Sequence, residues 1–388
     1  MQINPGGRLA PEDIVGRDRE IHRYWQILER QSLVLSAERR VGKTHIVWKM
    51  HNGGRKGFVT FYQDLEGVHR LVELVRSIYD AVGQNLSMTK RAKAKLIEWH
   101  GLLPRRFGDL ELPNARDNWQ ALLATAVTDA LDAMPEQKLV LMWDELPLML
   151  HNMQRTEGAA DTLQLLDLLR RFRQQNDRLR FLFTGSIGLH LVLNSLRRAG
   201  NANDPTNDMQ VETVPPMVRG EALDLAVRLL SSIALAQSDS GATAAAIVDA
   251  VDGFPYYIHH VADHLSLLGR SVGPADVLAC VDGIVAADND PAHLRYYVER
   301  IQTYYPPDDA ALALLILGAI ANSDAGLDLD ELTNLVRHQK PEVVDERVRQ
   351  VCDLLRQDHY LTLSQRGRVP EYDFRWRLVK RWWRKNRP

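Results

Sequence analysis

The segment that most constrains this chain is Ala37-Glu38-Arg39-Arg40-Val41-Gly42-Lys43-Thr44, which follows the short apolar run Ser32–Ser36 and precedes a helical stretch from Lys43. A glycine-containing loop that ends in Gly-Lys-Thr between a strand and a helix surrounds phosphate groups with backbone N–H groups. The N-terminus of the helix adds positive potential there. We therefore expect a bound nucleoside triphosphate, ATP, with Lys43 at its β- and γ-phosphates and the Thr44 hydroxyl on Mg²⁺. Ala37 replaces the usual first glycine, which weakens the match without cancelling it.

A second signal is the strand-like run Lys138–Trp143, which delivers Asp144 and Glu145 at its C-terminal end. Ligands of open parallel sheets bind at that edge. We expect Asp144 to hold Mg²⁺, directly or through water, and Glu145 to deprotonate the attacking water as a general base. The alternative is a strand followed by a solvated acidic turn. Asp64, which ends an earlier strand, is a weaker acidic neighbour.

A third buried strand, Arg180–Thr184, runs into Thr184-Gly185-Ser186. We expect Thr184 and Ser186 to reach the γ-phosphate or the attacking water, although a Thr-Gly-Ser sequence is also common in ordinary turns that leave a strand. These hydroxyls, with Lys43 and Glu145, form the predicted catalytic set.

The order of elements predicts an α/β fold. Apolar strands, including Gly57–Tyr62, alternate with helical segments such as Glu66–Ala81 and Leu163–Gln174, which indicates a parallel sheet covered by helices on both faces. The basic stretch Ser87–Asn114 interrupts the alternation, and we interpret it as an insertion. Residues 1–217 are the expected ATPase core.

The second half of the chain is predicted to be helical up to the Pro306–Pro307 pair, which marks a boundary. Residues 218–305 form an expected helical lid. Three helical runs and two strand-like pieces then follow, the order of a winged-helix domain, over residues 306–388.

Composition excludes several classes of protein. A net charge of −2 is not that of a protein that coats nucleic acid over its whole surface. The two cysteines, Cys280 and Cys352, lie far apart and predict neither a disulfide nor a zinc site. The N-terminal residues show no signal segment, and the apolar run Ala310–Ala321 is shorter than the roughly 18 residues that a membrane span needs. We expect a cytoplasmic protein without a membrane partner.

Taken together, Val15-Gly16-Arg17-Asp18-Arg19-Glu20, the Arg39–Thr44 segment, Asp144-Glu145-Leu146-Pro147, Thr184-Gly185-Ser186 and Gly253-Phe254-Pro255 resemble the archaeal-type ATPases. These belong to the AAA+/STAND branch of P-loop NTPases and are similar to archaeal origin-initiator ATPases. The resemblance covers nearly the whole chain, and it implies that Val15, Gly16 and Arg17 lie against adenine while Pro255 closes the base pocket. The expected nucleotide-binding residues are Val15, Gly16, Arg17, Ala37, Arg39, Arg40, Val41, Gly42, Lys43, Thr44, His45 and Pro255.

Arginine placement refines the resemblance. Initiator-type relatives carry a nucleotide-sensing arginine near Gly253–Tyr257, and its absence here favours a STAND-type switch over a processive motor. Arg197 and Arg198 follow Ser186 where AAA+ relatives place a catalytic finger, so Arg198 joins the predicted catalytic set. Arg170, Arg171 and Arg173 are further finger candidates, and a solvated helix face is the alternative for all of them.

The segment Phe374–Pro388 carries seven Lys or Arg and no acid, interleaved with Trp376, Trp382 and Trp383. Residues 375–388 and the winged helix could bind double-stranded DNA. Equally, the tryptophans could pack in the core while the charges face water. The His259-His260 pair and His264 offer helical i, i+4 spacing without a carboxylate ligand beside them, and packing explains them better than a metal.

Three functions remain open. The first is an ATP-dependent switch whose domains reorient on hydrolysis. The second is a DNA-binding protein in which nucleotide is mainly structural. The third is a component of a defence or mobile-element system that docks on a protein partner or forms a homo-oligomer. No nuclease, protease or methyltransferase motif is present in the sequence.

Overall fold

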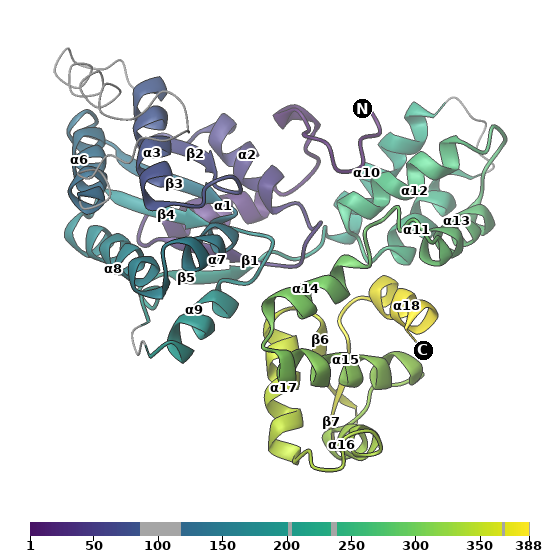
Figure 1. The fold of residues 1–388 in the computed structure, drawn as a ribbon. Helices are drawn as coiled ribbons and strands as arrows, with labels where there is room; N and C mark the ends of the chain where they lie inside the picture. The colour runs from purple at the N-terminus through teal and green to yellow at the C-terminus, as the bar shows by residue number, and fades with distance from the viewer. Residues whose placement is uncertain (86–117, 201–203, 234–238, 367–368, 388) are drawn as a thin grey trace. The chain divides into compact units, whose positions relative to one another are not determined.

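The computed structural model describes residues 1–85, 118–200, 204–233, 239–366 and 369–387 (Figure 1). The predicted insertion Ser87–Asn114 lies outside these residues. The chain divides into two compact units, and we describe each by itself. The sheet unit comprises Arg17–Ser36 and Lys43–Val214, and the helical unit comprises Met1–Gly16, Ala37–Gly42 and Pro215–Pro388.

The sheet unit is built on a five-stranded sheet whose paired strands are all parallel, which confirms the predicted fold class. The strand order is β2-β3-β4-β1-β5, so β4 lies between β1 and β3. The strands are β1 (Leu33–Ser36), β2 (Phe58–Asp64), β3 (Lys138–Asp144), β4 (Leu179–Phe183) and β5 (Gln210–Thr213).

Burial shows that both faces of the sheet are covered. Every residue of β4, and every residue of β3 after Lys138, is buried although alternate side chains point to opposite faces. Trp143 of β3 stacks on Phe183 of β4 and meets Phe181 edge-on, so large aromatic rings fill the centre of this core. The core holds the carboxyl ends of these strands in fixed positions.

The helices of the sheet unit follow the strands along the chain. They are α1 (Asp18–Leu28), α2 (Lys43–Gly53), α3 (Leu71–Asn85), α6 (Trp119–Asp132), α7 (Leu146–Thr156), α8 (Ala159–Gln175) and α9 (Leu189–Arg198). The start predicted for α3, at Glu66, is wrong by five residues. The Asp64 side chain accepts the Glu66 N–H at 3.0 Å and holds a turn there, and the Glu73 carboxylate accepts the N–H groups of His69 and Arg70 just before the helix.

The helical unit contains a middle region of helices and a C-terminal region of helices and one hairpin. The middle helices are α10 (Arg219–Ser232), α11 (Ser240–Ala250), α12 (Pro255–Ser266), α13 (Pro274–Ala286) and α14 (Tyr296–Tyr304), and the short η1 (Pro11–Asp13) precedes them in the chain. The C-terminal region consists of α15 (Pro307–Asn322), α16 (Leu329–Arg337), α17 (Asp345–Gln357), the antiparallel hairpin β6 (Leu361–Arg366) and β7 (Val369–Phe374), and α18 (Arg377–Asn386).

Among the described residues, no helix has both the length and the apolar character that crossing a membrane requires. Cys280 is half-buried and Cys352 is buried, and burial raises the pKa of both thiols, to about 11 and about 12. They behave as small apolar residues of the helical unit.

Candidate functional site

The carboxyl ends of β1, β4 and β3 meet at one edge of the sheet because the three strands are parallel neighbours. β1 leads into the Ala37–Gly42 loop, β3 ends at Asp144, and Thr184 follows directly after β4. The sheet therefore brings Asp144 and Thr184 to the same edge. Thr184 follows β4, which lies between β1 and β3.

Asp144 is surrounded by groups that suit a metal-binding carboxylate. Its side chain is hydrogen-bonded to the Thr44 hydroxyl. It also accepts hydrogen bonds from the Glu145 N–H at 3.1 Å and from the Tyr62 hydroxyl at 3.4 Å. Burial raises the pKa of Asp144, while the Thr44 hydrogen bond and the Lys43 charge act in the opposite direction. Asp144 and Thr44 thus present neighbouring oxygen atoms of the kind that Mg²⁺ prefers.

Lys43 lies at the first position of α2, and only 7% of its surface is exposed. Its charge lowers the pKa of both Asp144 and Glu145. A buried ammonium that acts on both carboxylates excludes the alternative of an acidic turn in open solvent.

Glu145 is held in a strained position and oriented by Ser186. Its φ of 57° lies in the left-handed region, which a residue with a β-carbon rarely adopts. One carboxylate oxygen, Oε2, accepts both the Ser186 N–H at 2.9 Å and the Ser186 hydroxyl at 2.7 Å. Burial raises the pKa of Glu145, and the two bonds from Ser186 lower it. A raised pKa brings a carboxylate nearer to the range in which it can take up a proton.

Gly185 explains why the turn after β4 can approach Glu145. A β-carbon at this position would lie 2.6 Å from Cδ and 3.0 Å from Cγ of the Pro147 ring. Only glycine allows the backbone to pass so close to α7, and this approach places Ser186 on Glu145.

The Thr184 hydroxyl is buried and has no hydrogen-bond partner among the described residues, although its backbone N–H and C=O pair with Trp143 and Leu146. Buried hydroxyls nearly always find a partner. An unsatisfied hydroxyl at the sheet edge, on the strand between the Lys43 and Asp144 segments, has the chemistry to bind a phosphate oxygen or a water.

The Ala37–Gly42 loop belongs to the helical unit. Arg40 (φ 71°) and Gly42 (φ 96°) both adopt left-handed backbone conformations, and Ala37 and Val41 are buried. The Arg40 guanidinium lies 4.0 Å from the centre of the Tyr256 ring, and that of Arg39 lies 4.0 Å from the Tyr296 ring. The two arginine side chains are therefore held by aromatic rings. The Arg39 N–H donates to Glu38 Oε1 at 3.1 Å, so the backbone N–H groups of Arg40 and Gly42 are the part of the loop that suits phosphate binding.

The predicted base-binding residues lie in tight turns. Gly16 has a φ of 67°, and a β-carbon there would lie 2.4 Å from the Glu221 side chain. Arg17, at φ 72°, is buried and pairs with Glu20 at 3.4 Å, and Val15 is half-buried. Pro255 begins α12, and its ring lies 3.6 Å from a β-carbon built on Gly42. His45 is half-buried in the first turn of α2.

The finger candidates differ in their surroundings. Arg173 forms a bidentate pair with Asp208, and Arg170 donates to the Asp204 carbonyl, so both hold the chain before β5. Arg197 pairs with Asp204 at 3.3 Å. Arg198 is exposed at the end of α9.

Two residues near the site were not anticipated. Tyr62 reaches Asp144 from β2, and Glu38 is a buried acid inside the loop. The strand register could have suggested Tyr62, because Asp64 and Asp144 are paired across β2 and β3. No sequence signal marks Glu38, since an acid between small and basic residues of a loop normally faces water.

The terminal helix α18 carries the segment predicted to bind DNA. Trp382 and Trp383 are buried and meet edge-on, which favours core packing over base stacking. Three cations on the helix pair with carboxylates of the helical unit: Lys380 with Asp373, Arg381 with Asp282 and Arg384 with Asp324. These pairs reduce the positive charge available to phosphates.

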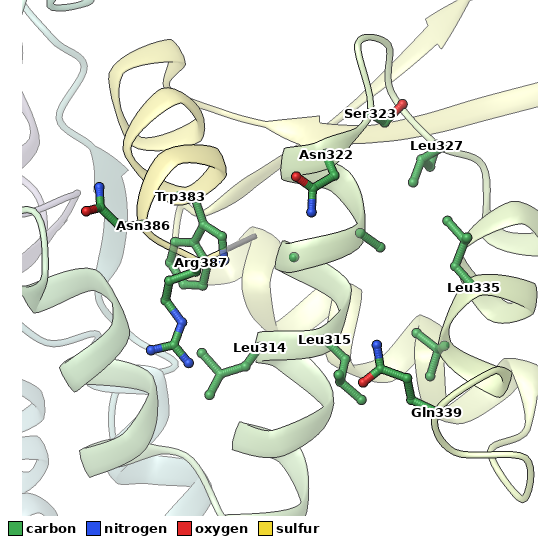
Figure 2. A pocket seen from close by; sticks show the side chains of 13 residues that line it. Leu314, Leu315, Asn322, Ser323, Leu327, Leu335, Gln339, Trp383, Asn386 and Arg387 are labelled. Atoms are coloured by element: carbon green, nitrogen blue, oxygen red, sulfur yellow. The ribbon is translucent and has the colours of Figure 1, made fainter. Parts of the chain in front are cut away.

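The helical unit also has a hollow of about 770 Å³ in its C-terminal region, between α15, α16 and α18 (Figure 2). Leu314 and Leu315 of α15 and Leu335 of α16 face it, together with Trp383 of α18 and Arg387, which follows that helix. None of the predicted nucleotide-binding or catalytic residues lines this hollow.

The three histidines of α12 lie elsewhere: His259 accepts the Asn4 N–H at 3.2 Å, and burial lowers the pKa of His260 to about 4.

Comparison with known proteins gives a fold relationship. No protein-family model matches the sequence, and no curated protein matches it. The chain is similar to the solved structure of a Walker-type ATPase of Pyrococcus abyssi, with a TM-score of 0.66, 14% identity, and 99% of this chain and 100% of that chain covered. This likeness confirms the fold that the resemblance implies, a P-loop NTPase sheet followed by a helical C-terminal part.

Two further structures match with lower TM-scores. The ORC2 protein of Aeropyrum pernix gives a TM-score of 0.45 at 12% identity, with 97% of this chain and 96% of that chain covered. Cdc6p of Pyrobaculum aerophilum gives 0.41 at 14% identity, with 95% and 92% covered. Likenesses of this size do not bear on function, so the chemistry of the site must carry the functional argument.

Proposed function

We propose that this chain is an ATP-binding and ATP-hydrolysing molecular switch that depends on Mg²⁺. The observation that supports the proposal is the meeting of Lys43, Thr44, Asp144, Glu145 and Thr184 at one edge of the sheet. A buried cation, a paired hydroxyl and carboxylate, an oriented second carboxylate and an unsatisfied hydroxyl are together the parts that phosphoryl transfer requires.

Binding roles follow from the side chains. The Lys43 ammonium would neutralise the β- and γ-phosphates, and the amides of the Ala37–Gly42 loop would bind their oxygens. Thr44 and Asp144 would hold Mg²⁺, whose charge stabilises the phosphate oxygens when it is bound. The buried Thr184 hydroxyl would gain the partner that it lacks.

Glu145 would orient a water and accept its proton. Ser186 holds one carboxylate oxygen through two hydrogen bonds, which leaves the other, Oε1, as the atom that would face the water. Burial supports this role because it raises the pKa of the carboxyl group.

The switch would act on the C-terminal region, which we propose is a winged helix. The loop that would bind phosphate and the C-terminal region both belong to the helical unit. A nucleotide on the loop would therefore act within the unit that contains the C-terminal region. We propose a protein partner, because three of the α18 cations, Lys380, Arg381 and Arg384, already pair with carboxylates.

Calorimetric titration with Mg²⁺–ATPγS, followed by a phosphate-release assay with ATP, tests the proposal. Lys43→Ala should abolish binding. Glu145→Gln should bind within a few-fold of the unmodified chain and hydrolyse at least about 100-fold more slowly, the typical contribution of a general base. Lys49→Ala is a matched control on the same helix, because Lys49 pairs with Asp18. Absence of Mg²⁺-dependent binding to the unmodified chain would refute the proposed function.

A second measurement decides between the partner classes. Fluorescence anisotropy of a labelled duplex, titrated at low and at physiological salt, should show little binding by the full chain. Strong, salt-sensitive binding that disappears in Lys385→Ala/Arg387→Ala would favour DNA as the partner.

A further inference from the structure

A buried chain of charges links the phosphate-binding loop to the C-terminal region within the helical unit. It consists of Glu38 in the loop, Arg300 on α14 and Asp358 at the end of α17, three positions far apart in the sequence. Their side chains are no more than 1% exposed. Burying three charges carries a large desolvation penalty unless each is paired, so such an arrangement needs good geometry to persist.

Arg300 is the central member. Its Nη1 lies 3.2 Å from Glu38 Oε1, and its Nη2 pairs with Asp358 Oδ1. The planar guanidinium can bind two carboxylates at once through separate nitrogen atoms. A lysine side chain has only one nitrogen, so it cannot reproduce this arrangement. Arg300 therefore joins the loop to the C-terminal region through one rigid group.

Each end of the chain is tied to backbone or to a neighbouring ring. At the loop end, Glu38 Oε1 also accepts the Arg39 N–H at 3.1 Å, so the same oxygen holds Arg300 and the loop backbone. At the other end, the Tyr305 hydroxyl donates to Asp358 Oδ2 at 3.1 Å. A displacement of the loop backbone would consequently move the Glu38 carboxylate, which would alter its contact with Arg300 and, in turn, the contact between Arg300 and Asp358.

We propose that Arg300 is a positioning residue: it holds the phosphate-binding loop through Glu38 and couples nucleotide binding at that loop to the order of the C-terminal region through Asp358. This inference rests on the proposed function, because it requires a nucleotide on the loop. It adds the path by which the nucleotide acts on the C-terminal region. Coupling of this kind is reciprocal, so loosening the chain should weaken nucleotide binding as well.

The test removes all three charges together, because removing one partner would leave an unpaired buried charge and could unfold the protein. The variant Glu38→Gln/Arg300→Met/Asp358→Asn keeps similar side-chain volumes. The matched control is Asp309→Asn/Arg347→Met, which removes another ion pair of the C-terminal region that does not involve the loop. Affinity for Mg²⁺–ADP is measured by calorimetry, and hydrogen exchange of amides 356–361 is measured with and without Mg²⁺–ADP.

In the unmodified chain and in the control, Mg²⁺–ADP should slow the exchange of amides 356–361. In the triple variant, affinity should fall about tenfold, and the remaining nucleotide-bound protein should show no change in exchange at these amides. A triple variant that binds as tightly as the unmodified chain, with the same nucleotide-dependent protection, would overturn the inference while leaving the proposed function intact. An unmodified chain that binds no nucleotide would overturn both.

Two milder variants keep the inference testable if the triple variant does not fold. Arg300→Lys retains the charge but cannot bridge both carboxylates, so it should bind Mg²⁺–ADP yet lose most of the protection at amides 356–361. Tyr305→Phe removes one hydrogen bond to Asp358 and should reduce the protection by a smaller amount. Unchanged protection in both variants would contradict the role of Arg300.

Discussion

Asp144 is a carboxylate whose surroundings favour function over stability. Burial raises its pKa, so the folded protein without ligand holds the proton more tightly than the unfolded chain does. A raised pKa in the folded state means that stability is present at low pH and is lost as the pH rises through the folded-state pKa.

We expect Asp144→Asn to stabilise the ligand-free protein at pH 7 by roughly 1 kcal/mol, as often happens at functional residues. The difference from the unmodified chain should shrink as the pH falls towards about 4, the ordinary pKa of Asp. Urea unfolding at several pH values measures this. Mg²⁺-dependent nucleotide binding should show the opposite trend and weaken on acidification, because the metal needs the charged carboxylate. Equal stability of the two proteins at pH 7 would contradict the prediction.

Gly185 is a residue at which the absence of a β-carbon keeps Ser186 close to Glu145. Gly185→Ala would force a β-carbon to within 2.6 Å of Pro147, so the turn must move and take Ser186 from Glu145. We expect a loss of about 1–3 kcal/mol of stability and at least a tenfold slower hydrolysis, with nucleotide affinity little changed. Gly283→Ala is the control, since Gly283 lies inside α13 with open space around it and alanine should be neutral or stabilising there.

At the scale of elements, α18 is an amphipathic helix whose tryptophans belong to the core of the helical unit. Trp383 is 1% exposed and packs against Phe374 of the hairpin and against Trp382. On the polar side of α18, Lys380, Arg381 and Arg384 form ion pairs with carboxylates of the helical unit. The helix is therefore an integral part of the C-terminal region.

We expect Trp383→Ala to cost about 3–5 kcal/mol, because it empties a large buried volume. Denaturant unfolding followed by tryptophan fluorescence measures the loss. Lys385→Ala, on the exposed side of the same helix, should change stability by less than about 0.5 kcal/mol. Equal effects of the two substitutions would show that α18 does not contribute to the core.

At the scale of the whole molecule, a ligand that binds only the folded chain must stabilise it. Mg²⁺–ATPγS at 100 times its dissociation constant contributes about 2.7 kcal/mol. For a protein of 388 residues that corresponds to a rise in the thermal midpoint of about 3 °C. Differential scanning fluorimetry should show the rise for the unmodified chain and for Glu145→Gln, and none for Lys43→Ala. A rise that persists in Lys43→Ala would place the nucleotide elsewhere.

The sequence was sufficient where the signal is local and strong. Gly42-Lys43-Thr44 after a strand, and Asp144-Glu145 after a run of apolar residues, identify their elements because phosphate-binding loops and buried strands have short-range patterns. The helices of the middle and C-terminal regions were also predicted, apart from α14, since their apolar residues recur at helical spacing. Strand β5 (Gln210–Thr213) was missed because it is a short edge strand that is buried on neither face and therefore carries no apolar run.

What only the tertiary structure decided are the relations between distant residues. The strand order places Thr184 on the strand between the Lys43 and Asp144 segments, and packing leaves its hydroxyl unsatisfied. Folding also buries Glu38 against Arg300 and Asp358, although each is by itself an ordinary surface residue type. The sequence by itself predicted the strand, loop and helix around Lys43 and the buried strand before Asp144, because these depend on local backbone and neighbouring side chains. Which groups meet, and which charges lose their water, depends on long-range packing that no short pattern records.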